Sequence, residues 1–161
     1  MTNQSQWIWN ASAQGSDVYV DFVEKFTGRQ GRTYRLELSC DTDYTVWCNG
    51  VLAGFGQYGD YINYKVYDGL DLSPYIKSGQ NELLITVWYT GLDSQTYIRK
   101  PAGLRYEVYE GDQLLQVSDE LTLSRPNANY IPGRCDMISS QLGPTFYYDA
   151  TKQSGEFTSP R

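Results

Sequence analysis

Apolar and polar residues alternate in short runs along the first two thirds of the chain. The most complete run covers residues 33–40, in which every second residue is apolar. Its apolar members are Tyr34, Leu36, Leu38 and Cys40. Residues 18–26 repeat the pattern, with Val18, Val20 and Phe22 on one face. A period of two is that of a strand with one buried face, so both runs predict half-buried antiparallel strands.

Asn49-Gly50 predicts a tight hairpin. The alternation continues through residues 43–48 and runs directly into this pair, and Val51 and Leu52 follow it. Both residues of an Asn-Gly pair tolerate positive φ, which the favoured two-residue hairpin turn requires. The return strand is therefore expected to begin at Val51. A loop is expected from Gly54 onward, since glycines and tyrosines alternate irregularly there.

The most hydrophobic run is residues 82–90, and it predicts a strand near the centre of the fold. Leu83, Ile85, Val87 and Tyr89 fall on one side, and Leu84, Thr86 and Trp88 fall on the other. Apolar residues on both sides are typical of a strand that is covered on both faces.

The remaining segments carry weaker signals. Residues 71–76 predict a single helical turn or tight bend, and residues 78–81 predict another turn. A further hairpin is expected around Gly111-Asp112, and a last strand is expected at 146–148.

These elements predict an all-β fold, an antiparallel β-sandwich or barrel. The length of 161 residues suits one domain with a real core. Residues 1–152 are predicted to form this single domain. Residues 153–161 are polar, with glycine and proline, and are predicted to be a C-terminal linker or tail.

The charge and the hydrophobic pattern of the chain argue against two classes of partner. Its net charge is −6 and no basic cluster appears, so a nucleic-acid partner is not expected. No apolar stretch approaches the ~20 residues of a membrane span, so no membrane partner is expected. Residues 1–7 lack a basic start and an apolar run, which favours a cytoplasmic protein.

The titratable residues leave little room for catalysis within this chain. Histidine is absent, which excludes Ser-His-Asp and Cys-His catalysis. Cys40, Cys48 and Cys135 are odd in number and form no CxxC pair, which argues against a disulfide framework and a zinc site. No metal or cofactor is expected. Asp41 and Asp43 could be the acid pair of a glycosidase, but turn and cap hydrogen bonding is the favoured interpretation, so no catalytic residue is predicted.

Aromatic residues are the candidate binding groups, because a sugar ring presents an apolar face of C–H groups that matches an aromatic plane. The candidate carbohydrate-binding residues are Trp47, Tyr58, Tyr61, Trp88 and Tyr89. The competing interpretation is core packing together with an interface to a neighbouring domain.

Three segments, 41–50, 66–72 and 79–85, carry a family pattern: a strand, an Asn-Gly hairpin, a Tyr-Asp bend, a Gly-x-Asn turn and a buried strand. Supporting pieces are Trp7-Ile8-Trp9, Ser94-Gln95-Thr96-Tyr97, Ala102-Gly103-Leu104, Gln141-Leu142-Gly143 and Tyr148-Asp149-Ala150. This order resembles the galactose-binding-like jelly rolls attached to glycoside hydrolases. Within that group it is most similar to the N-terminal β-sandwich of bacterial α-L-rhamnosidases of glycoside hydrolase family 78. One departure is Pro101-Ala102-Gly103-Leu104, where the family pattern has Pro-Gly-Leu.

The resemblance implies a non-catalytic accessory domain. The catalytic acids of that family lie in a large helical barrel further along the chain, and nothing in this sequence resembles the barrel. The expected partners are therefore the catalytic domain of the same parent chain and a carbohydrate, for this family a rhamnose-containing glycan. The parent is expected to be a glycoside hydrolase and this fragment is not. Two alternatives stay open: an autonomous carbohydrate-binding module, and a purely structural or dimerisation domain.

Overall fold

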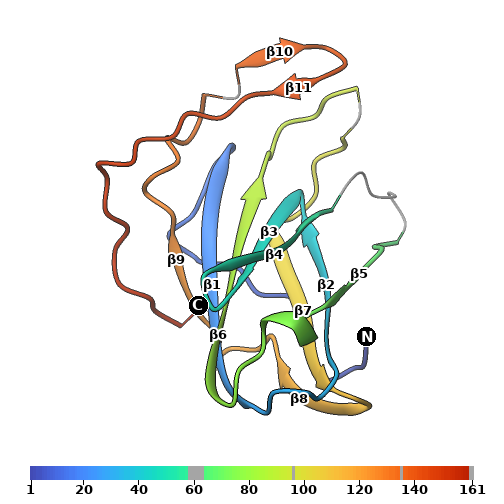
Figure 1. Ribbon diagram of the computed structural model, residues 1–161. Helices are drawn as coiled ribbons and strands as arrows, with labels where there is room; N and C mark the ends of the chain where they lie inside the picture. The colour runs from blue at the N-terminus through green and yellow to red at the C-terminus, as the bar shows by residue number, and fades with distance from the viewer. Residues whose placement is uncertain (58–63, 96, 135, 160–161) are drawn as a thin grey trace.

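A computed structural model describes residues 1–57, 64–95, 97–134 and 136–159 (Figure 1). Within these ranges the regular elements are antiparallel strands and one turn of 3-10 helix, Ser73–Tyr75 (η1). No helix in this part of the chain is long and apolar enough to cross a membrane.

Two sheets form the body of the molecule, and both are antiparallel. The first has the order β4-β3-β6-β1-β9, and the second has the order β5-β2-β7-β8. The strands of the first sheet are Val51–Gly56 (β4), Asp43–Cys48 (β3), Gly79–Tyr89 (β6), Val18–Gly28 (β1) and Leu123–Pro126 (β9). Those of the second are Asp68–Asp71 (β5), Tyr34–Asp41 (β2), Gly103–Glu110 (β7) and Gln113–Val117 (β8). A small separate hairpin joins Met137–Ser139 (β10) to Gly143–Pro144 (β11).

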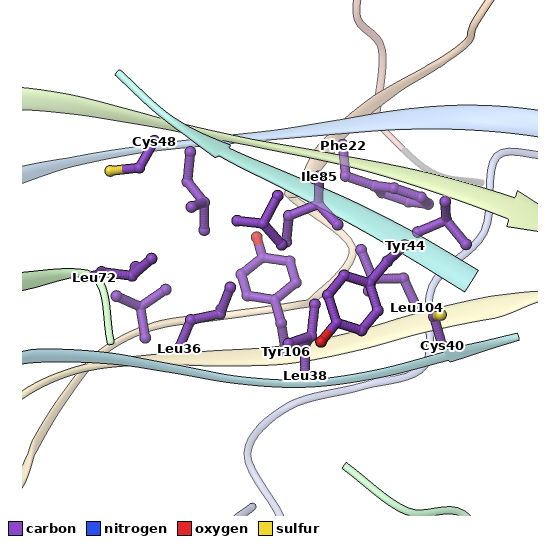
Figure 2. Close-up of a cluster of buried hydrophobic side chains, with 14 of the residues drawn as sticks. Phe22, Leu36, Leu38, Cys40, Tyr44, Cys48, Leu72, Ile85, Leu104 and Tyr106 are labelled. Carbon is purple, nitrogen blue, oxygen red and sulfur yellow. The ribbon is translucent and has the colours of Figure 1, made fainter. Parts of the chain in front are cut away.

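The core lies between the two sheets. Figure 2 shows Leu36, Leu38 and Tyr106 of the second sheet facing Phe22 and Ile85 of the first. All five side chains are fully buried. Burial of one Leu or Phe side chain contributes about 1.5–3 kcal/mol, so this shared interior is the main force that holds the sheets together.

The predicted sandwich is confirmed, and so are its principal strands. In β2, the four residues predicted to share a face are all buried: Tyr34, Leu36, Leu38 and Cys40. β1 and β6 pair along their whole length, from Val18 opposite Tyr89 to Gly28 opposite Gly79, in the middle of the first sheet. The Asn49-Gly50 turn has positive φ at both residues, as the hairpin prediction requires.

Three local predictions are wrong. A loop was expected from Gly54 onward, but β4 continues through Gly54 to Gly56. A Cβ on Gly54 would lie 2.9 Å from a methyl group of Leu70, so glycine here lets β5 approach closely. β6 begins at Gly79, inside the predicted turn. The strand expected at 146–148 is absent, and Tyr148 forms an isolated bridge with Tyr130 instead.

The N-terminal segment covers the outer face of the second sheet at the buried Glu107 carboxylate. The Thr2 backbone N–H donates to this carboxylate at 2.7 Å and the Ser5 hydroxyl donates at 2.6 Å. The Tyr109 hydroxyl donates to it as well. Burial alone would raise the pKa of Glu107, but these hydrogen bonds outweigh it and hold the pKa below its ordinary value.

The C-terminal segment covers part of the outer face of the first sheet. Tyr130 stacks on Tyr19 of β1 with ring centroids 3.9 Å apart. Within the predicted tail, Thr158 exchanges two backbone hydrogen bonds with Ser124 of β9. Residues 153–159 therefore run back along the sandwich (Figure 1), while the boundary of the domain at 152 stays a prediction.

Candidate functional site

Strand register brings an aromatic residue and a carboxylate together on the outer face of the first sheet. Asp43 of β3 lies opposite Trp88 of β6, and Trp88 lies opposite Tyr19 of β1. Side chains at paired positions point to the same face of a sheet. Asp43, Trp88 and Tyr19 thus form one transverse row near the ends of their strands.

A cleft of about 420 Å³ opens beside this row. Thr42, Asp43, Trp88 and Thr90 line it from the strand ends. Two further segments close it, the loop that carries Leu92 to Tyr97 and the β10–β11 hairpin. A smaller hollow of about 190 Å³ adjoins it, shares Asp43 and Trp88, and is bounded by Tyr130 and Phe146. The larger volume falls within the range of small-molecule sites, about 300–1,000 Å³.

Trp88 is held rigidly at this cleft. Its indole N–H donates to the buried Asp17 carboxylate at 2.9 Å. Its ring lies parallel to that of Tyr19, with centroids 6.0 Å apart and planes 19° apart, and Tyr19 is covered in turn by Tyr130. Because the polar atom of the indole is already satisfied, Trp88 offers the cleft apolar ring surface.

Asp43 is a half-buried carboxylate beside that ring. Burial, and to a smaller extent the neighbouring Asp41 carboxylate, raises its pKa to about 6. Among the residues that the structure describes, none donates a hydrogen bond to the Asp43 carboxylate. Its oxygens are therefore acceptors that the described part of the fold leaves unused.

Asp41 organises the rim of the cleft. Its carboxylate is buried, accepts a hydrogen bond from the Tyr97 hydroxyl at 2.6 Å and pairs with Lys65 Nζ at 2.9 Å. Burial and the adjacent Asp41 raise the pKa of Tyr97, so its hydroxyl stays protonated. Thr42 Oγ1 accepts the Thr90 backbone N–H at 3.0 Å and ties the start of β3 to the end of β6.

The three predicted binding residues that the structure describes, Trp47, Trp88 and Tyr89, do not gather at one place. Trp88 lines the cleft. Trp47 lies on the same face of the sheet but four residues further along β3, opposite Leu84, and it is 37% exposed. Tyr89 points to the opposite face, where its ring contacts Trp9 and its hydroxyl donates to the Lys100 carbonyl at 2.8 Å. Tyr58 and Tyr61 lie outside the described residues.

Sequence reasoning missed two polar residues that line the cleft, Asp43 and Tyr97. Asp43 was assigned to turn chemistry, and Tyr97 belonged to a family motif without a role. The alternation in residues 43–48 already places Asp43 and Trp47 on one face, but the pairing of Asp43 with Trp88 depends on the register of β3 against β6.

Cysteines and acidic groups are scattered over the described part of the chain. No group of three His, Cys, Asp or Glu residues is arranged there to hold a metal ion. Cys40 and Cys48 are buried free thiols on different sheets. Burial raises the pKa of Cys48 to about 11, so this thiol stays protonated and unreactive.

Solved structures share this fold. The chain superposes on the GH78 family rhamnosidase of Bacillus sp. GL1 with a TM-score of 0.78 and 19% identity, covering 93% of this chain and 16% of that chain. The α-L-rhamnosidase of Aspergillus terreus gives a TM-score of 0.63 at 13% identity, with 93% and 22% covered. The lectin of Pleurotus ostreatus in complex with GalNAc gives 0.53 at 18% identity, with 98% and 47% covered. No family model and no curated protein matches the sequence.

At these identities the likeness defines the fold. The chain is an antiparallel β-sandwich of a type shared by lectins and glycoside hydrolases. More particularly, it has the fold of a domain that occurs within GH78 rhamnosidases, and it spans less than a quarter of the length of the rhamnosidase chains it matches.

Proposed function

We propose that the chain is a non-catalytic accessory domain of an α-L-rhamnosidase-like glycoside hydrolase. It packs on the catalytic barrel of the parent chain and assists recognition of the carbohydrate substrate. The observation that carries the proposal is the superposition on the Bacillus rhamnosidase, which covers 93% of this chain and 16% of that one. A match of nearly the whole of one chain to a small part of another is what an accessory domain produces.

An open apolar surface supports packing against another domain. The outer face of the first sheet carries a second row, Trp47, Leu84, Val23 and Leu123, at matched strand positions. Leu121, which is 75% exposed, extends this row beyond β9. A groove of about 390 Å³ runs along it, lined by Val23, Leu84, Leu121 and Leu123 among others. Trp47, Leu121 and Leu123 are exposed, and clustered exposed apolar side chains mark interaction surfaces.

The test is made on the complete open reading frame that contains this chain. The full-length protein is expected to hydrolyse an aryl α-L-rhamnoside, and residues 1–161 alone are expected to give no turnover above background. A reading frame without a hydrolase domain, or cleavage by residues 1–161 alone at enzyme-like rates, would overturn the proposal.

A pair of matched variants tests the packing surface. Leu123→Glu places a charge in the apolar row, whereas Gln113→Glu places one on an exposed position of β8 in the other sheet. In the full-length protein, Leu123→Glu is expected to lower the melting temperature of the parent far more than Gln113→Glu does. In residues 1–161 alone the two variants are expected to behave alike, because Leu123 is then exposed. An equal effect of both variants in the full-length protein would argue against packing at this row.

A further inference from the structure

We infer that the cleft between Trp88, Asp43, Tyr97 and the β10–β11 hairpin is a binding site for a neutral sugar. The inference rests on the proposed function, which it deepens by giving the domain its own ligand site and the class of ligand. Trp88 and the hairpin supply the apolar walls, and Asp43 supplies the hydrogen-bond acceptor for sugar hydroxyls.

The lining of the cleft matches the two-sided chemistry of a sugar ring. A pyranose has apolar C–H faces and a rim of hydroxyl groups, so its site needs apolar surface and polar acceptors side by side. Trp88, Leu92 and Leu142 give the cleft apolar surface, and Thr42, Asp43 and Gln141 give it hydrogen-bonding groups. Aromatic rings are well suited to such amphipathic ligands.

Asp43 is the feature that most directly calls for a ligand. Burying a carboxylate without hydrogen-bond donors costs free energy, and groups of this kind are usually paired. None of the described residues donates to Asp43, although it lines both the cleft and the adjoining hollow. A sugar hydroxyl in the cleft would donate a charge-assisted hydrogen bond, which is stronger than a neutral one.

The charges around the cleft favour a neutral sugar over an acidic one. The charged side chains among its described lining residues are Asp43 and Asp93, both acidic. Lys65 is paired with Asp41 behind the rim. Arg99 and Lys100 line a separate hollow, which meets the cleft at Leu92. A uronic acid or a sulfated sugar would place its charge beside carboxylates, and such like-charge contacts discriminate strongly between ligands.

Two side chains of the cleft, Trp88 and Tyr97, are held by hydrogen bonds within the protein. Asp17 holds the Trp88 indole, and Asp41 holds the Tyr97 hydroxyl. Side chains that are held before binding lose less conformational entropy when a ligand binds. This lower cost favours the binding of a small ligand that makes few contacts.

Isothermal titration calorimetry on residues 1–161 tests the inference with L-rhamnose, galactose, N-acetylgalactosamine and glucuronic acid, each at up to millimolar concentrations. At least one neutral sugar is expected to bind with a millimolar or tighter dissociation constant, and glucuronic acid is expected to bind at least tenfold more weakly. Failure of every neutral sugar to bind, or glucuronic acid binding as tightly as the best neutral sugar, would overturn the inference.

Variants then locate the site. Trp88→Ala and Asp43→Asn are each expected to weaken binding at least tenfold, and Asp43→Asn preserves the shape of the side chain if Trp88→Ala fails to fold. Phe55→Ala is the matched control, since Phe55 pairs with Thr45 on the same face, is 76% exposed and lines neither the cleft nor the adjoining hollow, so affinity is expected to be unchanged. Loss of binding in Phe55→Ala with full binding in Asp43→Asn would place the sugar elsewhere.

The two proposals fail separately. If the full-length protein hydrolyses rhamnosides but residues 1–161 bind no sugar, the cleft is not a sugar site and the accessory role stands. If residues 1–161 bind a neutral sugar through Asp43 but the reading frame encodes no hydrolase, the accessory role fails and the sugar site stands.

Discussion

Replacing Asp43 by Asn is expected to stabilise the protein at neutral and alkaline pH. Burial raises the pKa of Asp43 from 3.8 to about 6 in the folded protein. The folded state therefore holds this proton more tightly than the unfolded state does. The contribution of Asp43 to the free energy of unfolding therefore falls as the pH rises from 3.8 to about 6. Above that window the folded protein carries the full free-energy cost of the buried charge.

The size of the effect follows from the two pKa values. Their difference is 6 − 3.8, about 2 pKa units, and each unit corresponds to about 1.4 kcal/mol, which gives about 3 kcal/mol. Asp43 is partly exposed, and solvent screening of such a group reduces the figure to about 1–2 kcal/mol. Asn keeps the shape of the side chain and removes the charge, so Asp43→Asn should gain about 1–2 kcal/mol at pH 8 and a small fraction of that at pH 4.

Urea denaturation followed by far-UV circular dichroism at pH 4 and pH 8 measures this difference. Asp112→Asn, in the exposed turn between β7 and β8, is the control for general effects of lost negative charge. An equal gain at both pH values, or no gain at pH 8, would show that burial of the Asp43 charge does not limit the stability of the fold.

Three further substitutions probe other parts of the structure. Leu36→Ala removes a fully buried side chain and is expected to cost about 2–5 kcal/mol in urea denaturation, whereas Leu121→Ala, at an exposed position, should change stability by less than about 0.5 kcal/mol. Gly50→Ala forces a Cβ onto a residue with φ of +78° and is expected to cost about 1–2 kcal/mol by the same measurement, while Gly155→Ala should be near neutral. Glu107→Gln loses charge-assisted hydrogen bonds and is expected to cost about 1.5–3 kcal/mol and to speed amide hydrogen exchange at Thr2. A protected Thr2 amide in Glu107→Gln would show that other contacts hold the N-terminal segment.

The strands that were predictable from the sequence bury one face and are joined by local turns. In β2 the alternation of Tyr34 to Cys40 is the direct imprint of one face in the core. The Asn49-Gly50 turn is equally local, because positive φ is a property of those two residues. Both signals lie within a few residues of chain, and both identified their elements correctly.

β9 escaped prediction because its pattern is inverted and its partner is distant. Ser124 is buried, where it accepts a hydrogen bond from Asn10 Nδ2 at 3.0 Å, and Leu123 faces outward. Polar residues inside and apolar residues outside are the reverse of the usual strand signature. The strand exists because it pairs with β1, roughly a hundred residues earlier in the chain, and no short window of sequence contains that information.

The candidate site was also predictable only where the signal is local in the sequence. Trp88 was identified as an aromatic platform from its residue type, and the alternation along β6 correctly separated it from Tyr89. The neighbourhood of Asp43 and Trp88 comes from the pairing of β3 with β6. Tyr97 reaches the rim through its hydrogen bond to Asp41. Contacts that depend on long-range register and on a loop conformation leave no periodic trace in the sequence.

The anchoring of the N-terminal segment on Glu107 has a practical consequence for anyone who shortens this protein. A boundary drawn at the first strand, Val18, would look safe in a strand diagram but would delete Thr2 and Ser5. It would leave the carboxylate of Glu107 facing water instead of these donors and would uncover the sheet beneath them. Poor expression of such a shortened protein would then reflect the loss of the contacts between the N-terminal segment and Glu107. It would say little about the stability of the sandwich itself.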